Sequence, residues 1–229
     1  MQGDDISVNI VFQLGPVAIS TTVVTTWLLM VALGLFAWLS TRRLVLDPGP
    51  LQTAIEGVVA TIEDAVKAVA PNNTPQLLPF IGSLWIFLVS ANLSGLIPGV
   101  HSPTRDLSAT AGLAILVFLS AHWFGIRDQG FRNYLRHYLS PSPILLPFHL
   151  LSEVTRTIAL AVRLFGNIMS LEMTALLVLV VAGFLAPVPI LMLHIIEALV
   201  QAYIFGMLAL IYIAGAMQSH QLQRQREKE

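Results

Sequence analysis

The chain has 229 residues, of which 55% are hydrophobic and 11% are charged, and its mean hydropathy is +0.76. Soluble domains are typically about 25% charged, so this composition excludes an ordinary soluble domain and indicates an integral membrane protein. The formal net charge of -1 and the lack of a basic cluster exclude nucleic acid as a partner. The absence of cysteine excludes disulfides, thiol catalysis and cysteine metal sites.

The N-terminal part of the chain predicts one membrane span followed by an amphipathic helix. Residues 17–40 are apolar and end at Arg42 and Arg43, which the positive-inside rule assigns to the cytoplasmic side. The acidic N-terminus lacks the basic start of a signal peptide, so we expect no cleaved signal. In residues 51–70 apolar side chains recur at helical spacing and charged side chains occupy the other face, which predicts an amphipathic helix lying at the cytoplasmic surface or packed on a partner.

Two further spans are predicted at residues 77–97 and 107–125. The second returns to a basic loop that contains Arg127, Arg132 and Arg136, which is typical of a cytoplasmic loop. Counting spans from that loop places the N-terminus outside the cell and the C-terminus in the cytoplasm.

Residues 143–185 and 190–220 predict two helices that are too long to stand upright. Residues 148–185 contain no strong helix breaker, and as one helix they would reach roughly 55 Å, whereas the hydrocarbon core of a bilayer is about 30 Å thick. Such helices must break or tilt strongly. We therefore expect residues 1–229 to form a single all-α membrane domain. It should have about five transmembrane helices, the last two long and strongly tilted, and one amphipathic interfacial helix.

Arg163 is the most informative residue, because a guanidinium inside an apolar span costs roughly 3 kcal/mol on insertion scales. It predicts a functional site, and a structural ion pair within the bundle is the alternative. Several polar residues fall on the same helical face as Arg163. They are His149, Ser152, Arg156, Asn167, Ser170 and Thr174.

A second polar group is predicted near the turn at residues 185–189. Glu172 lies nearly opposite Arg163 on the helical wheel, so we expect it to line a different compartment. His194 and Glu197 lie within two or three turns of the same connection, and Gln201 shares a face with His194. Carboxylate and imidazole together can hold or relay a proton. Interhelical hydrogen bonds would be enough to explain Glu172 or His194 taken alone.

Other polar residues have simpler explanations. Asn92 and Gly95 suit packing and a turn. Glu153 and Arg156 lie toward the cytoplasmic end of their helix, where snorkelling to the interface accounts for them. His122 carries no functional signal.

Two other functions remain open on these residues. His194 and Glu197 have the i, i+3 spacing of an intramembrane metalloenzyme, but the His-Glu-x-x-His motif is absent. A stand-alone ion antiporter commonly shows an inverted repeat with broken helices, and no repeat is visible here.

The run Arg163-Leu164-Phe165-Gly166-Asn167, with Glu172 after it and Gln201-Ala202-Tyr203-Ile204-Phe205 in the last helix, resembles subunit a of the rotary F-type ATP synthase. The runs at residues 92–99 and 103–107 are similar to that family as well. The resemblance covers roughly residues 75–220.

The resemblance implies a non-catalytic stator that couples proton or sodium flow to rotation of a ring of c subunits and to ATP synthesis. It implies peripheral-stalk b subunits as further partners, a bacterial inner membrane and no cofactor or metal. By similarity, Arg163 faces the essential carboxylate of the ring and Asn167 and Gln201 flank it.

By the same similarity, Glu172 and His194 line the half-channel open to the outside, with Glu197 as an extra acid. Ser152 lines the cytoplasmic half-channel. His149 stands where the family often has a carboxylate, so His149 and Glu153 are both candidates for that path. Arg105 stands where a small residue is common. The residues implied in ion translocation are Arg163, Asn167, Glu172, His194, Gln201, Glu197, Ser152, His149 and Glu153.

Overall fold

The computed structural model describes residues 10–14, 17–42, 45, 49–97, 100, 102–131, 134, 146–183, 186 and 188–226. The helices are α1 (Thr21–Thr41), α2 (Pro50–Val69), α3 (Thr74–Ser94), the short 3-10 helix η1 (Pro103–Arg105), α4 (Leu107–Gln129), α6 (Leu146–Ala182) and α7 (Val188–Arg226). Five of them, α1, α3, α4, α6 and α7, are long and apolar enough to cross a membrane. This confirms the expected all-α membrane protein.

Three basic residues used for the predicted orientation, Arg43, Arg132 and Arg136, lie outside the described residues.

A short hairpin precedes the first helix. Strand β1 (Ile10–Leu14) pairs antiparallel with β2 (Val17–Ser20), with Gln13 opposite Ala18. The prediction of helix from residue 17 is therefore wrong, and α1 begins at Thr21. The physical reason is local, because β-branched residues such as Val17 and Ile19 favour extended backbone when a partner strand is available.

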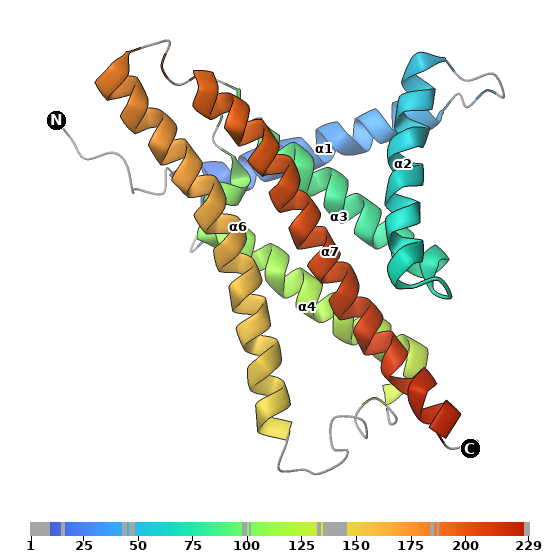
Figure 1. Cartoon of the computed structure of the whole chain (residues 1–229). Coiled ribbons are helices and arrows are strands. Elements are labelled where there is room, and N and C mark those ends of the chain that lie inside the picture. Colours follow the sequence, from blue (N-terminus) through green and yellow to red (C-terminus); the bar gives the residue numbers. More distant parts are fainter. Residues whose placement is uncertain are drawn as a thin grey trace.

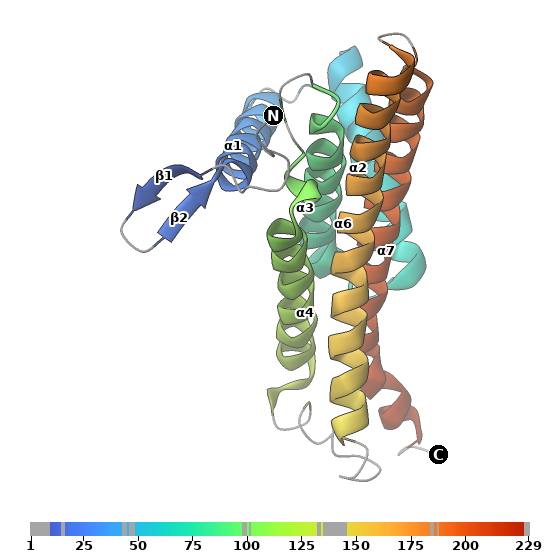
Figure 2. The ribbon, with the colours of Figure 1, turned by 90° about the vertical axis from the view of Figure 1, so that its left-hand side faces the viewer.

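The helix α1 stands apart from the rest of the bundle. None of its residues is buried, and its 21 residues reach roughly 32 Å, the length of an upright span. Figure 1 shows α6 and α7 running at a steep angle to α1. In Figure 2, α6 and α7 lie side by side next to α3 and α4. With 37 and 39 residues, α6 and α7 are too long for an upright crossing, in agreement with the expected tilt.

The helix α2 is amphipathic. Proline at its first position suits a helix start, where the missing backbone N–H has no partner to lose. Ile62 and Val66 are buried where α2 packs on α3, while Lys67 pairs with Glu63 at 2.7 Å on the polar side. Part of the apolar face, including Val58, stays exposed.

The core lies where α3, α4, α6 and α7 meet, and its fully buried side chains include Leu88, Leu164, Ile168, Phe205 and Ile213.

A glycine permits the closest approach between α3 and α7. A Cβ on Gly206 would collide with the Trp85 ring, and that ring stacks on Tyr203 with centroids 6.0 Å apart. The Trp85 indole Nε1 donates to the Tyr203 carbonyl at 3.4 Å.

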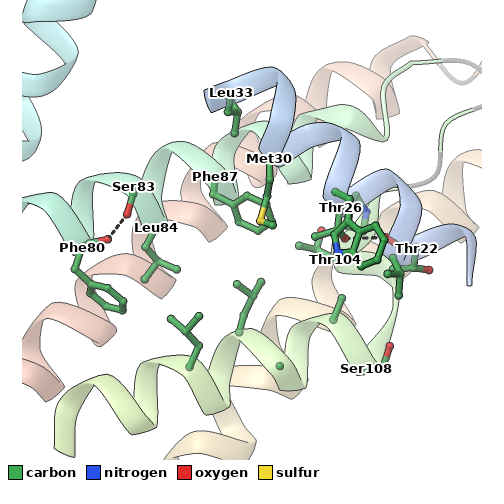
Figure 3. Close-up of a pocket in the computed structure, with 17 residues that line it drawn as sticks. Thr22, Thr26, Met30, Leu33, Phe80, Ser83, Leu84, Phe87, Thr104 and Ser108 are labelled. Atoms are coloured by element: carbon green, nitrogen blue, oxygen red, sulfur yellow. Dashed lines mark hydrogen bonds between the residues drawn. The ribbon is translucent and has the colours of Figure 1, made fainter. Parts of the chain in front are cut away.

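An apolar cavity of about 600 Å³ separates α1 from α3 and α4 (Figure 3). Two of its hydroxyl groups are satisfied within their own helices: Ser83 donates to the Phe80 carbonyl and Thr26 to the Thr22 carbonyl. Thr104, which also lines the cavity, donates to Asn92 Oδ1 of α3. The rest of the lining is mainly apolar.

Candidate functional site

Arg163 lies on the exposed face of α6. Its neighbours on the opposite face, Leu164 and Ile168, are fully buried, which fixes the orientation of the helix in this region. The guanidinium makes no hydrogen bond or ion pair with the part of the chain that the structure describes. The alternative of a structural ion pair inside the bundle is therefore not met among these residues. A permanent charge on an apolar span is costly without a partner.

One turn after Arg163, a hydrogen bond joins α6 to α7. Asn167 Nδ2 donates to Gln201 Oε1 at 2.8 Å, and Gln201 is only 2% exposed. The other amide atom of Gln201, Nε2, is buried without a hydrogen-bond partner. An unpaired buried donor costs about 1–3 kcal/mol. The unpaired donor lies at the contact between α6 and α7, beside Asn167.

Glu172 is held by a residue that the sequence did not identify as a partner. Arg105 Nη1, on η1, lies 3.2 Å from Glu172 Oε2, and the two side chains are 22% and 12% exposed. The second carboxylate oxygen, Oε1, is buried and has no hydrogen-bond partner. Glu172 therefore points toward η1 and the end of α3, and its contacts are separate from Arg163.

A buried hydrogen-bond network lies at the same end of the bundle. The Ser102 hydroxyl lies 2.6 Å from that of Thr104, and Thr104 donates to Asn92 Oδ1 at 2.9 Å. Asn92 Nδ2 in turn donates to the Ala198 carbonyl of α7 at 3.1 Å. Hydrogen bonds therefore join η1, α3 and α7 in one chain.

His194 joins this network, with its Nε2 3.4 Å from the Asn92 carbonyl oxygen, and it is only 3% exposed. The sequence predicts a packing role for Asn92, whereas the structure gives its side-chain amide two hydrogen bonds and its backbone carbonyl a contact with His194. We call these residues together with the ion pair the Glu172 cluster: Asn92, Ser102, Thr104, Arg105, Glu172 and His194.

Gly95 lies against this cluster. A Cβ placed on Gly95 would lie 2.9 Å from Glu172 Oε1 and 3.2 Å from Ser102 Cβ. A turn role alone does not explain the glycine, since any side chain here would displace the glutamate.

Glu197 is not brought into the cluster by any contact. It is half-buried on α7 and makes no hydrogen bond or ion pair with the described residues. Within the same residues, no three His, Asp or Glu side chains lie close enough to hold a metal ion. The arrangement therefore gives no support to the metalloenzyme alternative.

A second ion pair joins α4 and α6 at the other end of the bundle. His122 Nε2 lies 3.3 Å from Glu153 Oε2, and both side chains are about three-quarters buried, with 28% and 27% exposed. His122 Nδ1 lies 2.9 Å from the Phe118 carbonyl oxygen. His149 and Ser152, within one turn of Glu153, are exposed. We call these four residues the Glu153 cluster: His122, His149, Ser152 and Glu153.

The sequence missed His122 and Arg105 for the same reason. Each lies on one element and pairs with a carboxylate on a different element, so the pairing is not visible in the sequence. A signal was present, because a histidine in an apolar span is unusual and Arg105 departs from the small residue common at its position. Arg156, expected to snorkel, instead lies over the Tyr212 ring with its Cζ 4.5 Å from the ring centroid.

Asp106 anchors the start of α4 beside the Glu172 cluster. It caps the helix by accepting hydrogen bonds from the Ser108 backbone N–H and hydroxyl, each at 2.9 Å. Burial raises the pKa of this carboxyl, but hydrogen bonds from Ser108 and Thr22 outweigh burial and hold the pKa below its ordinary value. Asp106 is therefore occupied as a cap and is not a free acid at the site.

Comparison with known proteins places these features in a family. The family model described as ATP synthase A chain matches residues 23–214. ATP synthase subunit a 2 of Pelobacter propionicus is 67% identical over 218 residues, covering 95% of this chain and 96% of the relative. ATP synthase subunit a 1 of Hahella chejuensis is 65% identical, covering 94% and 92%. ATP synthase subunit a of Legionella pneumophila (strain Paris) is 58% identical and covers 94% of each chain. This chain, with Arg163 on a helix long and apolar enough to cross a membrane, therefore belongs to the ATP synthase subunit a family.

Proposed function

We propose that this chain is the ion-translocating stator of an F-type ATP synthase, lying beside a rotating ring of c subunits. The observation that carries the proposal is Arg163, an exposed guanidinium without a partner among the described residues, on a helix long enough to span a membrane. A carboxylate on each c subunit supplies the opposite charge that this position requires. The stator itself has no catalytic role, because ATP is made elsewhere in the complex.

The physical chemistry of a rotating carboxylate explains why the guanidinium is needed. A carboxylate that passes through lipid must be neutral, because burying its charge in hydrocarbon is costly. Near Arg163 the charged form is favoured, so the carboxylate releases its ion there. It must bind another ion before it re-enters lipid. Arg163 also repels a bare cation, which closes the direct leak between the two sides.

The two polar clusters supply access from opposite sides of the membrane. Glu153 and Glu172 lie roughly 14 Å from Arg163 along the axis of α6, in opposite directions. We assign the Glu172 cluster to the path from outside the cell, with Glu197 as an additional acid. We assign the Glu153 cluster to the cytoplasmic path. Because Arg163 separates them, an ion crosses only by riding on the ring.

Asn167 and Gln201 flank the guanidinium, with the half-buried Asn167 nearer the surface that faces the ring and Gln201 buried behind it. Their mutual hydrogen bond holds α6 against α7 one turn from Arg163, and it uses one of the two N–H groups of Asn167 Nδ2, which leaves the other as a donor. An amide donor next to a passing carboxylate helps to stabilise its charged form.

The remaining partners and the setting follow from the same assignment. The chain assembles with the other ATP synthase subunits, including peripheral-stalk b subunits, in a bacterial inner membrane. Its N-terminus lies outside and its C-terminus in the cytoplasm. The coupling ion is a proton or a sodium ion. Each elementary charge that crosses ~100 mV releases about 2.3 kcal/mol, which rotation transmits to ATP synthesis.

Replacing Arg163 in the intact complex tests the proposal. In lipid vesicles, Arg163→Ala is expected to abolish ion-driven ATP synthesis while the complex still assembles. Arg163→Lys is expected to restore little, because a lysine can lose its proton when buried whereas an arginine does not. Arg156→Ala is the matched control on the same helix and should retain synthesis. Normal coupled synthesis by Arg163→Ala would contradict the assignment.

A further inference from the structure

Arg105 and Glu172 form an ion pair that the stator mechanism does not use. The pair joins η1 to α6, with Arg105 Nη1 3.2 Å from Glu172 Oε2. Only this oxygen of the carboxylate is engaged, since Oε1 is buried and has no hydrogen-bond partner. The glutamate is thus fixed by one oxygen and presents the other to the space beside Gly95.

We infer that Arg105 is a positioning residue that holds Glu172 as a paired carboxylate, so that the glutamate passes the translocated ion without retaining it. This inference rests on the proposed function. A guanidinium is permanently charged, so a positive charge stays next to Glu172 over the whole working pH range. A cation that settled on Glu172 would lie close to that positive charge and would be repelled. Occupancy at Glu172 is therefore brief and the ion moves on.

The unpaired oxygen gives the passing ion its point of contact. Glu172 Oε1 lies against Gly95, where an added Cβ would come within 2.9 Å of it and within 3.2 Å of Ser102 Cβ. A carboxylate fully engaged by Arg105 would offer no oxygen to the ion. An unpaired carboxylate would hold the ion too strongly. With only one oxygen engaged by Arg105, Glu172 binds the passing ion with intermediate strength.

The other charged or titratable groups near this end do not replace Arg105. His194 Nε2 lies against the Asn92 carbonyl oxygen, and Asp106 is occupied by Ser108 and Thr22. Glu197 is an acid and makes no ion pair or hydrogen bond in the described part of the chain. Among the charged side chains that the structure describes near Glu172, only Arg105 is a permanent cation.

A purely structural role is the alternative to be separated from this one. The Arg105–Glu172 pair is largely buried, so removing one partner also leaves an uncompensated charge and weakens the fold. A structural link would change assembly or the maximal rate but would leave the apparent affinity for the outer ion unchanged. The apparent affinity is therefore the quantity to measure.

The experiment uses the intact complex in lipid vesicles and measures the rate of ion-driven ATP synthesis. Protons are varied on the driving side at fixed sodium, and sodium is varied at fixed pH. The half-saturating concentration and the maximal rate are both recorded. Arg105→Gln is expected to lower the half-saturating concentration on the order of tenfold and to reduce the maximal rate, because the ion is held longer. Arg105→Lys, which keeps a cation, should return both values toward those of the unmodified complex.

A double variant shows whether Arg105 acts through Glu172. In a Glu172→Gln background, adding Arg105→Gln should leave the half-saturating concentration unchanged, because there is no carboxylate left to restrain. An unchanged half-saturating concentration in Arg105→Gln alone would overturn the inference. Failure of Arg105→Gln to assemble, or the same shift in the Glu172→Gln background, would do so as well. If Arg163→Ala abolishes coupling while Arg105→Gln shows no shift, only the inference fails. If Arg163→Ala remains coupled, the proposed function fails.

Discussion

The two carboxylate clusters differ in the partner that holds each acid. Glu172 faces Arg105, whose charge is permanent, whereas Glu153 faces His122, whose charge can be lost between about pH 5 and 8. The Glu172 cluster also contains a buried hydrogen-bond network, while His149 and Ser152 beside Glu153 are exposed. The carboxylate of Glu172 therefore lies next to a fixed positive charge, whereas the carboxylate of Glu153 lies next to a group whose charge depends on pH.

The largest expected effect comes from removing each carboxylate in turn, which tests the comparison between the two clusters. Glu172→Gln should slow ion-driven synthesis on the order of 10²-fold, the low end of what a positioned acid–base group contributes. Glu153→Gln should slow it less, roughly tenfold, because exposed polar groups beside it let water enter. Both effects should fall short of the loss expected for Arg163→Ala. Rates of ATP synthesis in vesicles, normalised to the amount of assembled complex, show whether the three losses fall in this order. A larger loss from Glu153→Gln would reverse the comparison.

Exchanging the cation types tests whether the loss of charge at His122 matters. His122→Lys keeps a positive charge near neutral pH but removes the titration of the imidazole. We expect a several-fold slower rate and a flatter pH dependence on the cytoplasmic side. His122→Ala is the matched variant without any charge and should also flatten the profile. An unaltered pH profile in both variants would assign His122 to packing alone.

The smallest expected effect comes from a methyl group at Gly95. Gly95→Ala places a Cβ 2.9 Å from Glu172 Oε1 and 3.2 Å from Ser102 Cβ, so the glutamate must move. We expect a loss of about 1–3 kcal/mol in stability and a several-fold slower synthesis. Gly112→Ala is the control, because no atom lies within 4 Å of its Cβ. Thermal unfolding of the detergent-solubilised complex and synthesis rates provide the two measurements. Equal behaviour of the two variants would mean that Glu172 has room to move.

The helices and the central arginine could be predicted from the sequence because they depend on local properties. Hydropathy located the five spans, and helix length alone required the tilt of α6 and α7. The cost of a buried charge singled out Arg163 without any knowledge of its surroundings. The helical wheel also separated Glu172 from Arg163 correctly, since Glu172 contacts Arg105 instead.

The partners of the two acids could not be predicted, because each lies on another element. A helical wheel gives the direction in which Glu172 points from α6, but it does not show that Arg105 on η1 lies in that direction. The same holds for His122, which belongs to α4 and reaches Glu153 only after the helices pack. The hairpin before α1 was missed for a related reason, since a strand depends on a second strand as well as on its own residues.

The contact between Trp85 and Gly206 has a consequence for motion. Trp85 lies two turns from Asn92 on α3, and Gly206 lies about two turns from Ala198 on α7. If α7 shifted along α3 by about one helical turn, the indole ring would meet a side chain in place of the bare glycine backbone. The ring and the glycine thus oppose sliding of the two helices, and the 3.1 Å bond from Asn92 to Ala198 keeps their alignment. A stator that feels the drag of a turning rotor needs helices that resist such a shift.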